Sequence, residues 1–512
     1  MSDTKVDNKR IAKNTLLLYF RMIIIMLVSL YTSRVLLDAL GEANYGIYNV
    51  VGGVVAMFSV LSGSLSNSIS RFITYELGTG NLERLKSVFC TSVNIQILLA
   101  IIVFLLCEAV GVWFLNEQMN IPETRLEAAN FVLQCSIATF MVNLISIPYN
   151  ATIIAHEKMN AFAYISILEA GLKLMIAYLI YISSIDKLIL YASLMLGISI
   201  ILRIVYGIYC NRHFIEAKYH FIINLPLLKE MFGFAGWNFL GNTAYLFNTQ
   251  GVNMLINIFF GVSTNASRAI AVQVDGAVTQ FVNNFTTAIN PQITKSYAAA
   301  NYDYLYKLVC RGTKYSFFII YLFIVPVILE ADTILGIWLK EVPEETSIFL
   351  RLILLSSLAS LIGNPMYTAI MATGKVKRYQ ISVTLVGSLV FPLTWIAYKC
   401  GCAAYSTYII YALIYFSLNF IRLSTLKQLT NFPVNYFYRT VFCRISYCVM
   451  LSFILPYFIT TLLQPSFIRL ILVCFLSLSW SLFIIFLLGL EKDEKAFLRE
   501  KAKNFISHYL QH

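Results

Sequence analysis

The stretch that decides the fold of this chain reads STNASRAIAVQVDGAVTQFVNNFTTAINP and covers residues 263–291. It is long enough to cross a bilayer, because a spanning helix needs about 20 residues. On a helix its polar residues share one narrow stripe: Arg268, Asp275, Thr279, Thr286 and Asn290, with Asn283 at the edge. The opposite face carries Ala, Val, Ile and Phe. A charged side chain that faces lipid costs roughly 2.5–3.5 kcal/mol, so the stripe is expected to face protein or a water-filled cavity.

Two interpretations of this stripe are open. In the first it lines a transport path around which the other helices are arranged. In the second it is a helix–helix interface whose polar groups only satisfy one another. The presence of both Arg268 and Asp275 favours the first, because charged residues inside membrane segments usually serve function.

Composition places the whole chain in the membrane. The 512 residues are 59% hydrophobic and only 12% charged, whereas a soluble protein is about 25% charged. The sequence therefore predicts an all-α membrane protein of about 14 transmembrane helices, with no gap large enough for a soluble domain. The apolar runs lie at 14–37, 45–70, 87–113, 127–149, 161–183, 188–209, 233–258, 263–288, 312–330, 346–370, 380–398, 403–421, 440–462 and 467–490.

The positive charges predict the orientation. Lys5, Lys9, Arg10 and Lys13 precede the first run and should hold the N-terminus in the cytosol. This run is too long for a signal peptide and lacks a cleavage motif. With both termini cytoplasmic, most other Lys and Arg outside the spans also fall on the cytosolic side. The net charge of +12 is then a topology signal, and nucleic acid is not expected as a partner.

No enzymatic or metal motif is found. The ten cysteines show no metal-ligand or disulfide pattern, and the five histidines never pair at ligand spacing within one helix. Walker, HExxH and GxSxG motifs are absent from the sequence. We therefore predict no catalytic residue, metal or cofactor, and no ATP hydrolysis by this chain alone.

An internal repeat predicts two lobes. Residues 73–90 resemble 293–310 at an offset of 220, and 148–158 resemble 365–375 at an offset of 217. Two echoes at nearly one offset indicate a duplicated set of six spans, which suits alternating-access transport. The predicted domains are lobes at 1–215 and 225–430, an extra helix pair at 435–490 and a cytosolic amphipathic tail at 491–512.

The first run carries further candidate site residues. Arg21 lies about two turns inside the span and needs a wet or paired site, unless it extends to the cytosolic headgroups. Arg34 and Asp38 are four residues apart near the outer edge, where they either serve the cavity or pair with each other.

Later runs add amides and a charged pair. Asn238 and Asn242 lie on the run at 233–258, which is expected to face the stripe of the next run. Glu169 and Lys173 form either a structural pair or, with Asp38 and Asp275, candidate ion-coupling residues. The isolated Arg203 in the sixth run is either structural, which is slightly favoured, or functional.

Three segments carry a family resemblance: NTLLLYFR at 14–21, YTSRVLLDALGEANYGIYNVVGG at 31–53 and SNSISRFITYELGTGN at 66–81. They resemble the Wzx-type polysaccharide-biosynthesis (O-antigen) flippases of the multidrug/oligosaccharidyl-lipid/polysaccharide exporter superfamily. The resemblance implies two six-helix bundles in a V-shaped arrangement. It also implies transport of undecaprenyl-diphosphate-linked oligosaccharide across the bacterial inner membrane, with membrane lipid, a polysaccharide polymerase and a chain-length regulator as partners.

The same resemblance implies roles for individual residues. Arg21, Arg34 and Arg268 match positions where family members place cavity cations, and Asp275, Asn238, Asn242 and Asn283 complete the predicted cavity. Drug-exporting relatives carry an acid deep in the first span, whereas this chain has Arg21 there. The alternatives are a cation-coupled multidrug antiporter of the same fold and a flippase of the peptidoglycan lipid precursor.

Overall fold

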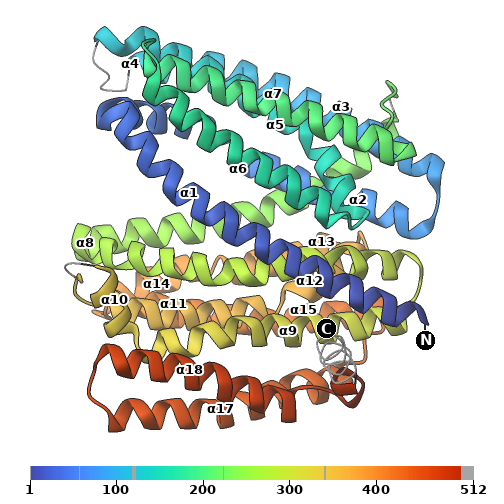
Figure 1. The fold of residues 1–512 in the computed structure, drawn as a ribbon. Helices are drawn as coiled ribbons and strands as arrows, with labels where there is room; N and C mark the ends of the chain where they lie inside the picture. Colours follow the sequence, from blue (N-terminus) through green and yellow to red (C-terminus); the bar gives the residue numbers. More distant parts are fainter. Residues whose placement is uncertain (1, 57, 118–122, 223, 340–341, 497–512) are drawn as a thin grey trace, which may run out of the picture. The chain divides into compact units, whose positions relative to one another are not determined.

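The computed structural model describes residues 2–56, 58–117, 123–222, 224–339 and 342–496 (Figure 1). Throughout these residues the chain is helical and contains no strand, which confirms the all-α prediction. The helices of the first half are α1 (Ser2–Ala56), α2 (Ser59–Thr79), α3 (Leu82–Leu106), α4 (Val112–Glu117), α5 (Leu126–Ala155), α6 (Met159–Ile182), α7 (Lys187–His213) and α8 (Leu225–Ala298). Those of the second half are α9 (Tyr302–Leu329), α10 (Ala331–Trp338), α11 (Thr346–Leu361), α12 (Asn364–Ala372), α13 (Lys377–Gly387), α14 (Val390–Lys399), α15 (Ser406–Thr430), α16 (Val434–Phe437), α17 (Cys443–Leu462) and α18 (Phe467–Ile484).

The chain folds into two compact units that share one helix. Unit 1 contains Met1–Thr243 and Thr287–Asn301, and unit 2 contains Ala244–Thr286 and Tyr302–His512. The two ends of α8 therefore belong to unit 1 and its middle to unit 2. These units are defined by packing, whereas the bundles at 1–215 and 225–430 are defined by sequence repetition. The limits of the bundles stay a prediction.

Helix α8 combines two of the predicted spans. Its backbone leaves the helical conformation at Gly261, with φ 84° and ψ −173°, between the predicted runs at 233–258 and 263–288. A positive φ of this kind is readily adopted only by glycine. The break at Gly261 therefore divides α8 into two helical halves, as the two apolar runs predict.

Ten helical segments of the described chain are long and apolar enough to cross a membrane: 82–117, 123–155, 159–182, 187–213, 302–329, 346–372, 377–399, 406–430, 434–462 and 467–489. They coincide with ten of the predicted runs. The four remaining runs lie within α1, α2 and α8. The total of fourteen spans stays a prediction. The first helix also ends later than predicted: α1 continues to Ala56, whereas the first predicted run ends at residue 37.

Each unit is held together by long helices that lie side by side (Figure 1). In unit 1, α5 packs along α7 and α3, and α1 packs along α6. In unit 2, α15 packs on α11, while α17 and α18 pack on each other and on α9. Burial of the apolar faces between these helices, around residues such as Val132 and Phe349, forms a separate core in each unit.

Each sequence echo contains a residue with positive φ at the same position in both of its copies. Gly80 precedes α3 with φ 76°, and Ala300, found 220 residues later, precedes α9 with φ 54°. Glu157 follows α5 with φ 58°, and Gly374, found 217 residues later, follows α12 with φ 73°. A left-handed residue costs roughly 1–2 kcal/mol when it is not glycine. The recurrence of both turns at the offsets of the repeat supports the duplication.

Two buried ion pairs join the C-terminal part of unit 2 to the rest of that unit. Arg469 of α18 lies 2.7 Å from the carboxylate of Glu330, whose side chain is 0% exposed. Lys314 of α9 lies 2.7 Å from the carboxylate of Glu494. Both pairs are shielded from solvent, so loss of one partner would leave an uncompensated buried charge. Beyond residue 496 the predicted amphipathic tail lies outside the described residues.

Candidate functional site

Arg268 is held inside unit 2 by neutral groups. Its Nε donates to the Tyr408 hydroxyl at 2.9 Å, its Nη1 to Asn253 Oδ1 at 3.0 Å and its Nη2 to the Thr249 carbonyl at 3.4 Å. Asn253 and Thr249 precede the break at Gly261, so Arg268 joins the two halves of α8 to each other and to α15. These contacts use three of the five guanidinium N–H groups. Two donors therefore remain for another acceptor.

Asp275 lies two turns further along α8 and does not pair with Arg268. Ser357 of α11 is a polar neighbour of its carboxylate. The buried Oδ1 atom makes no hydrogen bond within the described part of the chain. Unit 2 thus contains a carboxylate, inside a predicted span, that lacks a cationic partner among the described residues. Such a group can take up and release a proton or hold a cation.

A second arginine of unit 2, Arg422, directly follows the predicted run at 403–421 and was not among the predicted site residues. Arg422 lies on α15 and is only 8% exposed. It donates to the Tyr379 hydroxyl at 3.2 Å, to Asn419 Oδ1 at 2.9 Å and to the Ser360 carbonyl at 3.4 Å. Gly363 permits this approach, because a Cβ there would lie 1.7 Å from the guanidinium.

One face of α15 connects the two arginine clusters. It carries polar side chains at helical spacing: Tyr408, Tyr411, Tyr415, Asn419 and Arg422. The rings of Tyr411 and Tyr415 stack at 4.8 Å between centroids. The spacing of three and four residues could have revealed this face in the sequence. A search for charged residues does not identify this face, because four of its five members are uncharged.

Arg21 lies inside unit 1 in an aromatic environment. Its Cζ is 4.3 Å from the centroid of the Phe162 ring on α6, and its buried Nε makes no hydrogen bond within the described residues. Glu169 on α6 and Tyr206 on α7 are its electrostatic neighbours. The stacking on an aromatic ring stabilises the cation. The free Nε leaves a donor for a ligand.

Three further charged side chains accompany Arg21 on the helices of unit 1: Glu169, Lys173 and Arg203. The predicted pair forms, with Lys173 Nζ 2.6 Å from Glu169 Oε1. On α7, one turn before Tyr206, Arg203 lies 3.9 Å from the centroid of the Tyr149 ring. None of the described carboxylates forms an ion pair with Arg203 or Arg21. Positive charge therefore exceeds negative charge on these helices.

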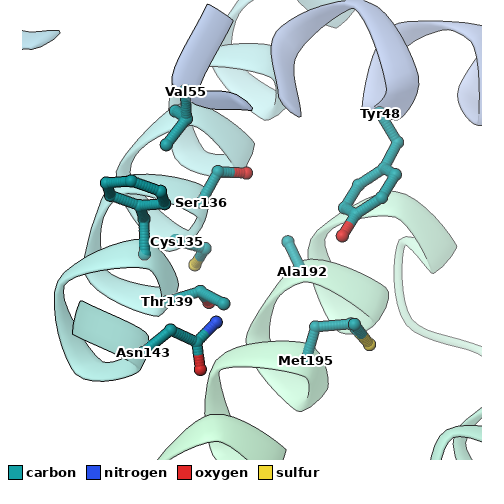
Figure 2. Close-up of a pocket in the computed structure, with 9 residues that line it drawn as sticks. Tyr48, Val55, Cys135, Ser136, Thr139, Asn143, Ala192 and Met195 are labelled. Atoms are coloured by element: carbon teal, nitrogen blue, oxygen red, sulfur yellow. The ribbon is translucent and has the colours of Figure 1, made fainter. Parts of the chain in front are cut away.

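A polar stripe on α5 was also missed by the sequence analysis. Its members are Ser136, Thr139, Asn143, Ser146 and Asn150, at steps of three and four residues. Ser136, Thr139 and Asn143, the first three members of the stripe, line a cavity of about 180 Å³ within unit 1. Figure 2 shows this cavity, whose walls come from α1, α5 and α7: Tyr48, Val55, Cys135, Ser136, Thr139, Phe140, Asn143, Ala192 and Met195.

The other predicted site residues lie apart from these clusters. Asn242 donates to Ser64 Oγ of α2 at 2.9 Å, and Asn238, also in unit 1, is buried. Asn283 is exposed near the end of the α8 segment that belongs to unit 2. The side chains of Arg34 and Asp38 lie outside the described residues. On the first half of α8, which was expected to face the stripe, the residues that bond to Arg268 are Asn253 and Thr249.

Comparison with known proteins decides the family. Residues 11–331, which include Arg21, Arg268 and Asp275, match the sequence profile of the polysaccharide biosynthesis proteins. The chain belongs to this family. Polysaccharide biosynthesis proteins of this kind belong to the multidrug/oligosaccharidyl-lipid/polysaccharide exporter superfamily, and they are membrane transporters and flippases, not enzymes. No curated protein matches the sequence.

Solved structures share the fold of this polysaccharide biosynthesis protein. MATE in the bent conformation has a TM-score of 0.70 at 14% identity, with 83% of this chain and 97% of that chain covered. An outward-facing multidrug resistance MATE transporter has a TM-score of 0.67 at 15% identity, with 82% and 97% covered. A transporter of the superfamily from Pyrococcus furiosus Vc1, described by the reverse polarity of its binding pocket, has a TM-score of 0.66 at 15% identity, with 82% and 97% covered. The protein therefore has a MATE-like, multi-pass membrane fold.

Proposed function

We propose that this protein is a flippase that moves undecaprenyl-diphosphate-linked oligosaccharide repeat units across the bacterial inner membrane by alternating access, for surface polysaccharide or O-antigen synthesis. The observation that carries the proposal is the set of arginines on its helices that are bound to neutral groups: Arg21, Arg203, Arg268 and Arg422. None of the four forms an ion pair with a described carboxylate. Family membership supplies the context in which these arginines are interpreted.

Arginine suits the charged part of this substrate. A diphosphate cannot cross hydrocarbon unaided, and guanidinium groups bind phosphate through paired, charge-assisted hydrogen bonds. Arg268 keeps two N–H donors free and Arg21 keeps its Nε free, as the contacts above describe. Hydroxyl and amide side chains suit the sugar part, and the polyprenyl tail can remain in the lipid. In this proposal both termini are cytoplasmic, and a polymerase and a chain-length regulator receive the product.

One observation favours a second candidate function, a cation-coupled multidrug antiporter. Asp275 is a carboxylate without a cationic partner among the described residues, and the solved structures of similar fold include multidrug transporters. Under the flippase proposal the same carboxylate is assigned to ion coupling, together with Asp38 and the Glu169–Lys173 pair. The excess of arginine over unpaired carboxylate favours an anionic substrate.

A deletion strain separates the candidates. Loss of surface polysaccharide with accumulation of undecaprenyl-linked repeat units supports the flippase. Drug sensitivity with intact polysaccharide supports the antiporter, and lysis on depletion supports transport of the peptidoglycan precursor. Normal polysaccharide in the deletion strain would refute the flippase proposal.

Complementation of that strain tests the arginines. Arg268→Ala and Arg21→Ala should each abolish polysaccharide export while the amount of protein in the membrane is unchanged. Arg212→Ala is the matched control, because Arg212 is exposed at the end of α7. It should complement fully. Normal export by either of the first two variants would remove that arginine from the transport site.

A further inference from the structure

The cavity on α5 differs chemically from the arginine clusters. None of its nine lining residues is charged, and its walls offer hydroxyl and amide groups beside apolar side chains. Figure 2 shows the side chains of Tyr48, Ser136, Thr139 and Asn143 directed into the same space. On α7, Met195 of the cavity is two turns from Arg203, about 12 Å along the helix axis. The cavity is therefore a separate, neutral site in unit 1.

Three of its polar groups are available to a ligand. Ser136, Thr139 and Asn143 make no side-chain hydrogen bond within the described part of the chain. Two other serines, one on α5 and one on α7, do form hydrogen bonds with the backbone. Ser146 donates to the Val142 carbonyl at 2.8 Å, and Ser193 donates to the carbonyl four residues before it at 2.9 Å. Helical Ser and Thr hydroxyls commonly bond back in this way. The free groups of the cavity thus present donors and acceptors toward its interior.

The size of the cavity limits what it can hold. Sites for drug-sized ligands occupy about 300–1,000 Å³, and this cavity has about 180 Å³. Since a water molecule occupies about 30 Å³, the space equals about six waters, which is comparable to one monosaccharide ring. A pyranose also combines hydroxyl groups with an apolar C–H face, and Phe140 supplies an aromatic surface on the same wall.

We infer that this cavity binds one uncharged pyranose of the transported oligosaccharide. Ser136, Thr139 and Asn143 bond to its hydroxyls, and its C–H face packs on Phe140. The walls of the cavity carry no charge, so it suits a sugar and not the diphosphate. This inference rests on the proposed flippase function and adds the substrate class of one subsite.

A protection assay on the purified full-length protein tests the inference. Ser136→Cys introduces a reporter thiol at the cavity, in a background in which the exposed Cys400, Cys402 and Cys443 are replaced by serine. The rate of maleimide labelling is measured with D-glucose, D-galactose or N-acetyl-D-glucosamine at millimolar concentrations, and with D-glucuronate as the charged comparison. The same background with Ser136 intact gives the rate from the remaining thiols. At least one neutral sugar should slow labelling severalfold, whereas glucuronate should not.

Variants of the wall decide whether the protection arises in this cavity. Thr139→Val and Asn143→Leu, each combined with the reporter, should raise the protecting sugar concentration about three- to tenfold through loss of one hydrogen bond. Ser146→Ala is the matched control on the same face and should leave it unchanged, since its hydroxyl already bonds to the backbone. No protection by any neutral sugar, equal protection by glucuronate, or unchanged protection in both wall variants would overturn the inference. The deletion strain tests the flippase function independently, because its polysaccharide readout does not depend on sugar binding in vitro.

Discussion

The buried contact between Glu157 and Lys295 gives the sharpest prediction for stability. Glu157 lies in the turn after α5, its side chain is 1% exposed, and it accepts from Lys295 Nζ at 2.8 Å and Gln292 Nε2 at 2.6 Å. Lys295 and Gln292 belong to the C-terminal end of α8. We predict that Lys295→Met strongly destabilises unit 1, because it removes the cationic partner of the buried carboxylate.

The magnitude follows from the buried charge that loses its partner. Removing one partner of a buried ion pair costs about 3–5 kcal/mol. At about 2–4 °C per kcal/mol for a domain of this size, the melting temperature of unit 1 should fall on the order of 10 °C.

Thermal unfolding in detergent, followed by intrinsic tryptophan fluorescence, measures the effect. Lys307→Met is the matched control, because this lysine is exposed on α9 and its loss should change little. Adding Glu157→Gln to Lys295→Met should recover most of the loss, since the buried charge is gone. If the single variant melts within about 2 °C of the wild type, or the double variant is no more stable than the single, the reasoning is refuted.

Three further predictions concern other contacts. Arg469→Met should destabilise unit 2 by about 3–5 kcal/mol in thermal unfolding, because Glu330 is left buried without its cation; a loss below about 1 kcal/mol would contradict this. Gly363→Ala should cost about 1–3 kcal/mol in the same assay, because the new Cβ displaces Arg422, whereas an unchanged melting temperature would show that the guanidinium moves freely. Burial raises the pKa of the Glu216 carboxyl. The hydrogen bond between this carboxylate and His156, together with the other favourable interactions of the carboxylate, lowers the pKa by more, so the pKa lies below its ordinary value. The stabilisation from Glu216 is therefore present above an ordinary glutamate pKa of about 4.3 and is lost as pH falls through the folded value; a stability difference between wild type and Glu216→Gln that persists at pH 3 would contradict this.

Much of the architecture could be predicted because apolar runs and repeats are local properties of the sequence. Ten predicted spans coincide with described helices, and the turns at Gly80 and Gly374 recur at the offsets of the repeat. The end of α1 was not predicted, because the polar residues around 38–44 suggest a loop where the structure continues the helix to Ala56.

The candidate site was less accessible to sequence reasoning. Lys295 and Lys314 were counted as cytosolic charges, but each forms an ion pair with a carboxylate 138 or 180 residues away in sequence. No local pattern reveals such a partner. Arg268 was identified by its position, yet its bond to Tyr408 of α15 depends on packing between distant helices. Ser136 and Thr139 carry no charge, so only their spacing along α5 could have indicated the cavity in the sequence.

The sharing of α8 between the two units affects how the chain can be divided. Because both ends of α8 belong to unit 1 and its middle belongs to unit 2, the chain crosses between the units at 243–244, before the break at Gly261, and again at 286–287, after it. Two polypeptides separated at 214–224 would therefore divide unit 1 between them, because 225–243 and 287–301 would remain on the second polypeptide.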